Sequence, residues 1–152
     1  KEIFIMFQGA TSLNLDVKGR LLVPVKHRTE LQSNAQGGMV LTAHPHRCLL
    51  LYPLDAWGPI RANIMGFSSF DKTASAYKRI LVGFAEELEL DNAGRLLISR
   101  TLRQFAHFEK QVMLIGQGSH FEIWSNVFWE KQLENLELEG DVMPADFKDF
   151  AL

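Results

Sequence analysis

The pattern of apolar and polar positions predicts a chain of alternating strands and helices. Imperfect period-two alternation and short apolar runs predict strands over residues 7–15, 21–23, 39–42, 48–52, 84–90, 96–98, 111–116 and 120–124. Apolar side chains at helical spacing predict helices over 25–31, 55–65, 72–82, the segment around Leu102, and 126–136. We expect Tyr77 in the third of these helices, and Trp129, Leu133 and Leu136 in the last, to point inward.

One short stretch of this pattern occurs twice. Residues 15–23 have the sequence Leu-Asp-Val-Lys-Gly-Arg-Leu-Leu-Val, and residues 90–98, which begin 75 positions later, have Leu-Asp-Asn-Ala-Gly-Arg-Leu-Leu-Ile. The predicted elements around the two copies also repeat: strand, turn, strand, short helix, two strands and a longer helix. Because a unit of under about 50 residues buries little apolar surface alone, we expect the two units to pair their strands and close a small barrel.

The repeated stretch has the chemistry of a tight turn. Asp16 and Asp91 can accept hydrogen bonds from backbone N–H groups two residues on, and Gly19 and Gly94 can adopt positive φ without steric cost. A type I turn with a glycine bulge would close a hairpin at each copy. The arginine after each glycine is not needed for a hairpin, so it is the functional candidate. The structural alternative is an Asp–Arg ion pair across the turn.

Basic residues follow these turns. The first turn is accompanied by Lys18, Arg20, Lys26, His27 and Arg28, and the second by Arg95, Arg100 and Arg103. If both turns lie on one side of the molecule, these side chains form one basic surface that could hold DNA phosphates and reach base edges. The alternative is an ordinary solvated charged surface. Arg28 and Arg103 also match at the 75-residue offset.

Composition and charge are compatible with this hypothesis. The chain has 152 residues, of which 47% are apolar and 22% charged, as in folded domains. Its net charge is −2, but residues 130–152 carry −5, which leaves +3 for the rest. The apolar run 48–52 is too short to span a bilayer, and Cys48 is the only cysteine, so no internal disulfide is expected. The first residues make a poor signal peptide, and Met6 is a candidate native start.

The sequence gives little support for catalysis or metal binding. His44, His46 and Cys48 lie at i, i+2 and i+4 and would share a face of a strand, but a fourth zinc ligand is missing nearby. The cluster at residues 86–89 has the pattern of an exposed acidic strand face. Phosphate-binding and nucleophile-elbow motifs are absent. We therefore predict a protein that is not an enzyme and has no cofactor and no metal.

Several segments together resemble the MraZ family. They are Met6–Thr11, Asn14–Arg20 with its Asn-Leu-Asp-x-Lys-Gly-Arg pattern, Val23-Pro24, Leu49–Pro53 and Asp91–Ile98. This resemblance, which extends from Met6 to about Trp129, implies an α+β fold in which two SpoVT/AbrB-like repeats form a swapped-hairpin (double-split) β-barrel with flanking helices. It also implies a regulator of the division and cell-wall gene cluster that binds short direct repeats in its own promoter as a ring-shaped homo-oligomer.

From this resemblance we expect repeats at residues 10–57 and 85–129, a helical linker at 58–84, and a helix end with an acidic tail at 130–152. Arg20 and Arg95 are expected to contact double-stranded promoter DNA, with Lys18 beside Arg20. The second turn has Asn92-Ala93 and lacks a counterpart of Lys18, so the first turn is the stronger candidate. The expected location is the cytoplasm and nucleoid, without membrane or small-molecule partners. The alternative function is a protein-interaction or antitoxin-like module on the same fold.

Overall fold

The protein has a mixed α+β fold, described here from a computed structural model that covers residues 6–33 and 37–139. Six strands form an antiparallel sheet in the order β1 (Ala10–Asn14), β7 (Gln111–Gly116), β8 (Phe121–Ser125), β4 (Leu49–Pro53), β3 (Gly38–Ala43) and β5 (Glu86–Glu89). Two short strands, β2 (Arg20–Leu22) and β6 (Arg95–Leu97), pair only with each other and form a separate antiparallel ribbon.

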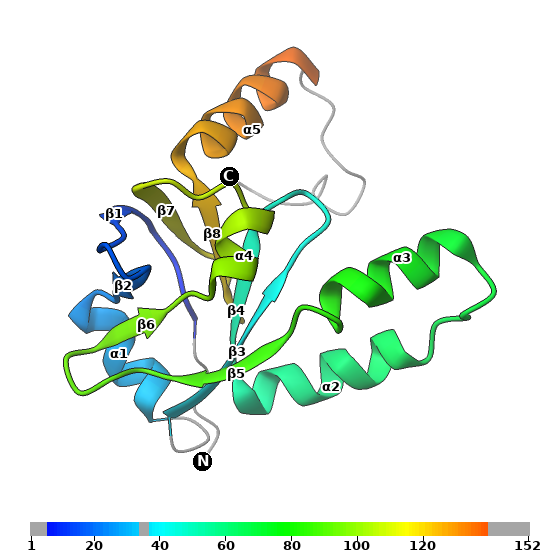
Figure 1. Ribbon diagram of the computed structural model, residues 1–152, viewed down its shortest axis with the longest axis horizontal. Coiled ribbons are helices and arrows are strands. Elements are labelled where there is room, and N and C mark those ends of the chain that lie inside the picture. The colour runs from blue at the N-terminus through cyan, green and yellow to red at the C-terminus, as the bar shows by residue number, and fades with distance from the viewer. Residues whose placement is uncertain (1–5, 34–36, 140–152) are drawn as a thin grey trace, which may run out of the picture.

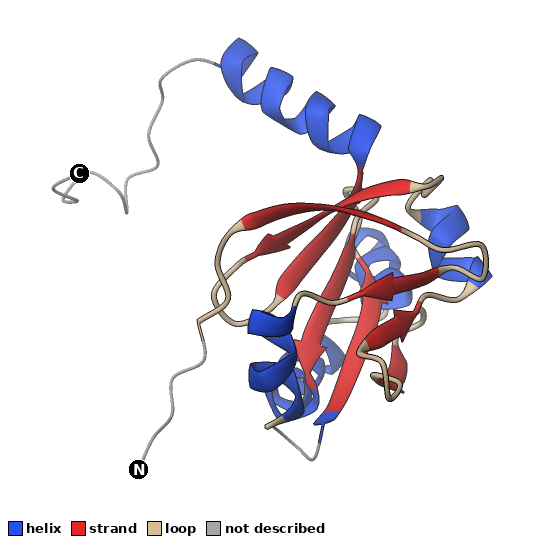
Figure 2. Ribbon diagram, turned by 90° about the vertical axis from the view of Figure 1, so that its left-hand side faces the viewer, coloured by secondary structure: helices blue, strands red, loops and turns tan. Residues whose placement is uncertain are grey.

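Five helices surround these strands among the described residues: α1 (Val25–Gln32), α2 (Leu54–Met65), α3 (Lys72–Leu81), α4 (Arg100–Phe105) and α5 (Asn126–Glu139). Helices α2 and α3 run side by side away from the sheet and form an arm (Figure 1). A hydrogen bond of 2.6 Å from Thr42 Oγ1 to the carbonyl oxygen of Leu81 fastens the base of this arm to β3. Helix α5 leaves the strands at one end and points away from the body (Figure 2).

The predicted internal repeat is confirmed at the level of element order. Strand, strand, helix, two strands and a helix follow one another in β1-β2-α1-β3-β4-α2 and again in β5-β6-α4-β7-β8-α5, with α3 between the two halves. Ser99 is the N-cap of α4, because its Oγ accepts a 3.3 Å hydrogen bond from the backbone N–H of Leu102.

The predicted type I turn with a glycine bulge is present at both copies: Gly19 N–H donates to the carbonyl oxygen of Asp16, Asp16 N–H donates to that of Arg20, and the same two bonds recur in the second turn. The hairpin does not continue into a longer two-stranded ladder. After the first turn only the isolated bridge between Leu15 and Leu21 joins the returning strand to the preceding one. Strand β2 pairs instead with β6 of the other half, while β1 pairs with β7 and β5 with β3. The halves thus exchange strands, and no local sequence pattern specifies such long-range pairing.

Two predicted strands are also shorter than expected. The strand predicted over residues 7–15 begins only at Ala10, because Gly9 has a φ of +100° that breaks the extended backbone. The strand predicted over 84–90 is confined to Glu86–Glu89.

Glu86 does not lie on an exposed face as predicted: it is half-buried, and its Oε2 accepts a 2.8 Å hydrogen bond from Ser99 Oγ.

The large sheet separates two apolar clusters. Alternate side chains of β4 point to opposite faces, so that Leu49 and Leu51 join one cluster whereas Leu50 and Tyr52 join the other. The first cluster packs against the ribbon, α1 and α4, and includes the fully buried Leu21 and Leu96. The second packs against α2, α3 and α5. Coverage of both faces explains why β4 is apolar throughout instead of alternating.

Some predicted inward side chains are exposed. Tyr77 is 45% exposed, and Leu133 and Leu136 are 44% and 65% exposed, whereas Trp129 is partly buried against the second cluster, as predicted. The physical reason is that α3 and α5 extend beyond the edge of the sheet, so that only the turns near the sheet find a surface to cover (Figures 1 and 2). Within the described ranges, no helix combines the length and the apolar character needed to cross a membrane.

Candidate nucleic-acid interface

The side chain of Asp16 organises the first turn. Its Oδ1 accepts hydrogen bonds of 2.9 Å from the backbone N–H groups of Lys18 and Arg20, and its Oδ2 accepts one of 2.6 Å from Nε of Arg20. Gly19 has a φ of +83°, and its N–H donates to the carbonyl oxygen of Asp16 at 3.0 Å. The predicted roles of Asp16 and Gly19 in forming the turn follow directly from this geometry.

The second turn has the same geometry. Asp91 Oδ1 accepts from the N–H groups of Ala93 and Arg95 at 2.9 Å, and its Oδ2 accepts from Arg95 Nε at 2.8 Å. Gly94 also has a φ of +83°. The Asp–Arg ion pair that was the structural alternative is therefore present in both turns. The pair uses only Nε of each arginine, so the two terminal nitrogens of each guanidinium take no part in it.

This ion pair aims the arginine. A half-exposed ion pair contributes little to stability, and the side chain of Arg20 remains 26% exposed and that of Arg95 36% exposed. Among the described residues, the terminal guanidinium nitrogens of Arg20 make no further hydrogen bond. The carboxylate therefore fixes the direction of the guanidinium and leaves its outer edge available for a ligand.

The same contacts predict an unusual titration of the two turns. The backbone N–H of Arg20 is the main cause that lowers the pKa of Asp16, and the backbone N–H of Arg95 acts in the same way on the pKa of Asp91. A carboxyl whose pKa is lower in the folded than in the unfolded state stabilises the fold above the unfolded pKa, and this stabilisation is lost as pH falls through the folded pKa. We expect carboxyl ¹³C NMR titrations of Asp16 and Asp91 with midpoints below the ordinary 3.8. Midpoints at or above that value would contradict the hydrogen-bonded turn.

The pairing of β2 with β6 places both arginines on one surface. Arg20 is paired with Leu97 and Leu22 with Arg95, so that the arginines are diagonal neighbours on the ribbon. Between them, Leu21 and Leu96 form the alternate pair and are completely buried. The outer face of the ribbon therefore carries Arg20, Arg95 and the half-exposed Leu22 and Leu97, which are 51% and 54% exposed. We call these four residues the ribbon face.

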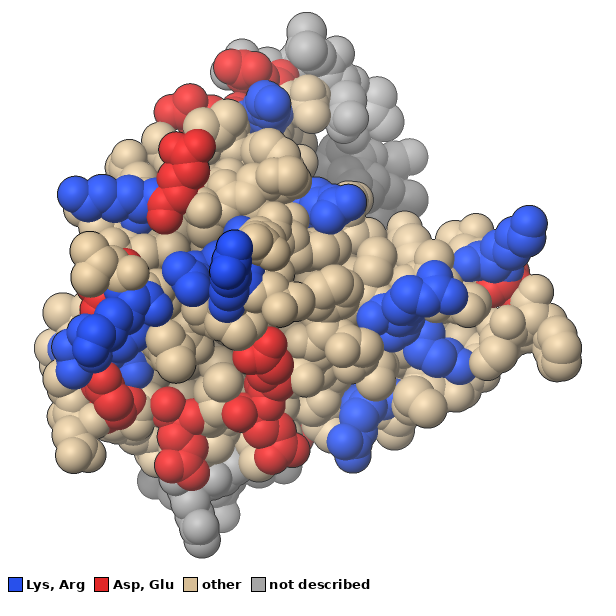
Figure 3. All heavy atoms as spheres, in the orientation of Figure 1, with Lys and Arg blue, Asp and Glu red and all other residues tan. Residues whose placement is uncertain are grey.

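Basic side chains gather around the ribbon face. Figure 3 shows Lys and Arg over the part of the molecule formed by β2, β6 and α1, with a separate group over α3. Lys18 is exposed in the first turn, and the corresponding Ala93 gives the second turn no charge. The first turn therefore carries more positive charge than the second.

Two of the predicted DNA-binding residues, Arg28 and Lys26, lie outside the ribbon face. Arg28 is half-buried, and its Nε donates a 2.8 Å hydrogen bond to the carbonyl oxygen of Val23. Lys26 is exposed at the start of α1, where its Nζ lies near Gly9 and it lines a hollow together with Gln8 and His27. Neither residue belongs to the ribbon face.

The exposure of the two leucines of the ribbon face was not predicted from the sequence. Leu22 and Leu97 stand in apolar runs that predict buried strands, and only the alternation around the fully buried Leu21 and Leu96 indicates that they point outward. Apolar side chains beside arginines suit contacts with thymine methyl groups in the major groove.

The His-His-Cys cluster that suggested zinc has other contacts. Nδ1 of His44 accepts a 3.0 Å hydrogen bond from the backbone N–H of His46. Burial raises the pKa of the Cys48 thiol, which disfavours the thiolate that a metal requires. Among the residues that the structure describes, no group of three or more His, Cys, Asp or Glu side chains is placed to hold a metal ion.

Comparison with known proteins gives a family for this fold and interface. A family model described as "MraZ protein, putative antitoxin-like" matches residues 6–80 and 81–146. A protein of Methylobacillus flagellatus named "Transcriptional regulator MraZ" is 61% identical over 148 residues, which cover 97% of this chain and all of that protein. Proteins with the same name from Aromatoleum aromaticum and Nitrosomonas eutropha are 54% and 45% identical, each over 97% of this chain and all of the relative. The chain belongs to the MraZ family.

Proposed function

We propose that this protein is a sequence-specific transcriptional regulator, acting as a repressor, that binds double-stranded promoter DNA with the ribbon face. The observation that carries the proposal is the pairing of β2 with β6, which sets Arg20 and Arg95 side by side, each aimed by its own aspartate. The relatives named as transcriptional regulators are similar over their full length and support this proposal.

The dimensions and chemistry of the ribbon suit the major groove. A groove about 12 Å wide admits a two-stranded β-ribbon, and an arginine whose terminal nitrogens are available can donate two hydrogen bonds to one guanine. Lys18 is exposed in the first turn and would lie beside the phosphate backbone in such a docking. Arg20 and Arg95 would then select the sequence, whereas Lys18 would hold the position.

The family resemblance extends the proposal to the biological target. We infer that the protein binds short direct repeats in its own promoter, ahead of the division and cell-wall gene cluster, and that it resides in the cytoplasm at the nucleoid. The two DNA-binding repeats would span residues 10–57 and 85–129 around the linker 58–84, and their exchanged strands would close a swapped-hairpin barrel. The pairing of β1 with β7, β5 with β3 and β2 with β6 supports this arrangement.

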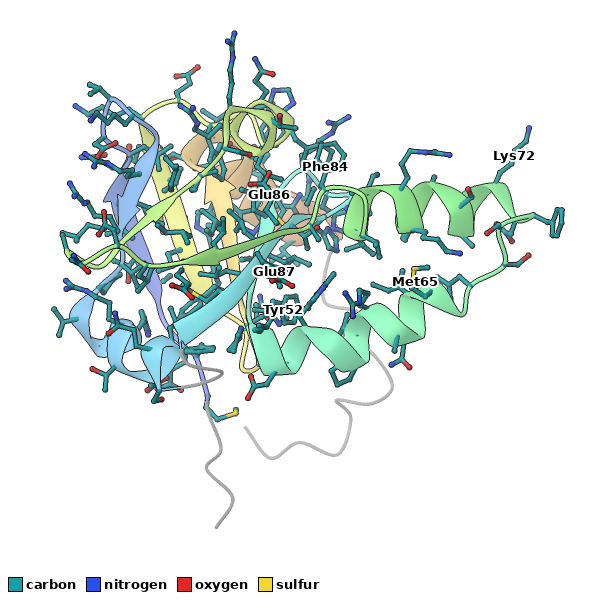
Figure 4. All side chains as sticks on the ribbon, turned by 60° about the horizontal axis from the view of Figure 1, so that its bottom comes forward. Tyr52, Met65, Lys72, Phe84, Glu86 and Glu87 are labelled. Atoms are coloured by element: carbon teal, nitrogen blue, oxygen red, sulfur yellow. The ribbon has the colours of Figure 1, made fainter. Side chains whose placement is uncertain are left out.

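Several subunits would act together in a ring-shaped homo-oligomer. The arm ends in exposed apolar side chains, since Met65 is 55%, Phe67 47% and Phe70 100% exposed, and helix α5 exposes others. Apolar side chains grouped on a projecting element are typical of subunit contacts. Figure 4 shows Met65 and Lys72 on the outer part of the arm, far from Glu86 and Glu87 at its base. Linked subunits that bind several DNA repeats gain affinity through effective concentration, which compensates for few contacts per subunit.

We expect the purified full-length protein to form a particle of several subunits and to bind DNA from upstream of its own gene more tightly than scrambled DNA. Phosphate contacts require steep salt dependence: each neutralised phosphate contributes about −0.9 to the slope of log K against log salt concentration. Light scattering measures the particle, and fluorescence anisotropy at several salt concentrations measures the binding. A monomer would contradict the ring, and salt-independent binding would contradict the DNA interface.

A second candidate function is a protein-interaction or antitoxin-like module on the same fold. The description of the matching family model as antitoxin-like, and the exposed apolar end of the arm, favour it. This alternative predicts that the protein is not retained by promoter DNA even at low salt, so the same titration separates the two functions.

A further inference from the structure

Each turn glycine is covered by an arginine from the opposite half of the chain. A Cβ atom built on Gly19 would lie 2.6 Å from Cζ of Arg103, and one built on Gly94 would lie 2.7 Å from Cζ of Arg28. These distances are shorter than van der Waals contact, so each guanidinium lies directly on the glycine of the other half's turn. Arg28 and Arg103 occupy equivalent positions at the 75-residue offset. The contact therefore occurs twice, in both directions.

Backbone hydrogen bonds cross between the halves at the same two places. The N–H of Ile98 donates to the carbonyl oxygen of Gly19 at 3.0 Å, and the N–H of Val23 donates to that of Gly94 at 3.1 Å. Val23 directly precedes Pro24 and α1, and Ile98 directly precedes Ser99 and α4. Each turn is therefore attached to the start of the helix that supplies the covering arginine.

The two covering arginines are held differently. Arg28 donates from Nε to the carbonyl oxygen of Val23 at 2.8 Å and from Nη1 to that of Ala93 at 3.4 Å, so it links its own half to the second turn. Nε of Arg103 is buried without a hydrogen-bond partner in the described part of the chain. Hydrogen bonds thus hold Arg28 on the second turn, whereas Arg103 is held on the first turn by packing.

We infer that Arg103 and Arg28 are positioning residues. Each holds in place the DNA-contacting turn of the other repeat. The inference rests on the proposed function for its consequence on DNA binding. The turn carries Asp16, which aims Arg20, so a displaced Gly19 redirects the guanidinium that meets the base. Neither repeat completes its own site, since each turn receives a covering arginine and a backbone hydrogen bond from the other repeat.

The planarity of the guanidinium explains why arginine is used here. A flat, delocalised group can lie against a glycine that has no side chain, whereas the ammonium of lysine is a compact, strongly hydrated point charge. Lysine would keep the positive charge but not the flat contact. A lysine substitution therefore separates a positioning role from a purely electrostatic one.

The test is amide hydrogen exchange by NMR on full-length protein, in the wild type and in Arg103→Met and Arg28→Met. In Arg103→Met we expect the amides of Arg20 and Ile98, which report on the first turn, to exchange about tenfold faster while those of Arg95 and Val23 change little. In Arg28→Met the pattern is expected to reverse. Arg100→Met is the matched control, because Arg100 is an exposed arginine on the same helix as Arg103.

The crossed pattern distinguishes positioning from general loss of stability, since a globally destabilised protein would accelerate both turns. Equal acceleration of both turns, or acceleration of the Arg95 and Val23 amides in Arg103→Met, overturns the inference. Arg103→Lys, a milder change, is expected to keep the fold and the charge but still to accelerate the first turn. Full restoration by lysine overturns the inference in favour of a charge effect.

Promoter DNA separates this inference from the proposed function. If the wild type binds, Arg103→Met and Arg103→Lys are expected to weaken binding about tenfold, with the lysine variant keeping the salt slope of the wild type. Wild-type binding with undiminished affinity in both variants contradicts the positioning role alone. Absence of wild-type binding contradicts the proposed function, while the crossed exchange pattern still decides how the turns are held.

Discussion

Arg20→Ala is expected to abolish discrimination between promoter and scrambled DNA. One bidentate contact between arginine and guanine supplies about 1–3 kcal/mol of discrimination, or roughly five- to more than hundredfold in affinity. The loss is multiplied across subunits that bind together. The ion pair with Asp16 is exposed, so its removal should leave the fold and the particle size unchanged. Fluorescence anisotropy with both DNA sequences, and light scattering on the same sample, measure the two effects.

Two matched variants sharpen this experiment. Arg61→Ala removes an exposed arginine from α2, away from the ribbon, and should reduce neither affinity nor specificity. Arg95→Ala removes the equivalent residue of the second turn, which lacks a counterpart of Lys18, and should cost less than Arg20→Ala. Undiminished specific binding by Arg20→Ala would mean that the arginine serves only the ion pair. An equal loss with Arg61→Ala would mean that only total charge matters.

Much of the turn geometry could be predicted from local sequence. Asp and Gly at a spacing of three favour a turn in which the carboxylate accepts backbone N–H groups and the glycine takes positive φ, and both turns have this geometry. A single copy of this motif predicts a turn only weakly. Two copies in equivalent places predict it more strongly, because they reflect one repeated structural unit.

The partners of these turns could not be predicted from local sequence. Whether β2 pairs with β1 or with β6 depends on contacts between residues about 75 positions apart, and both pairings satisfy the same apolar alternation. Arg28 illustrates the consequence. Its place near the first turn in sequence predicts a DNA contact there, but strand exchange carries its guanidinium onto Gly94 of the second turn. The match with Arg103 at the repeat offset shows only that the two arginines occupy equivalent positions, and does not by itself distinguish a DNA contact from a structural role.

The wrong prediction of inward-facing side chains near the ends of helices α3 and α5 had a different cause. Tyr77, Leu133 and Leu136 follow the apolar periodicity that normally faces a core, and that periodicity carries no information about where the sheet beneath the helix ends. An apolar stripe that continues past the sheet is left without a partner inside the chain. Such side chains agree with the proposed oligomer, in which another subunit would supply the missing surface.

Gly19→Ala is expected to destabilise the protein more than any substitution of a charged residue in the turns. Alanine at positive φ costs about 1–2 kcal/mol, because its Cβ crowds the following carbonyl oxygen. The same Cβ would lie 2.6 Å from Cζ of Arg103, so the guanidinium must shift, and because it is the far end of a flexible side chain this shift adds only a small further cost. The free energy of unfolding by urea should therefore fall by about 1–2 kcal/mol, with a small further loss from the displaced Arg103.

A second glycine and a double variant separate the two causes. Gly58 lies inside α2, and a Cβ added to it would meet open space, so Gly58→Ala should be neutral or stabilise by up to about 1 kcal/mol. Arg103→Ala added to Gly19→Ala removes the crowding but keeps the backbone strain, so the pair should be less destabilised than the sum of the single changes. Strict additivity would show that Arg103 does not press on the turn. A Gly19→Ala protein as stable as Gly58→Ala would show that the turn tolerates a side chain, and both the positive φ and the covering arginine would lose their importance.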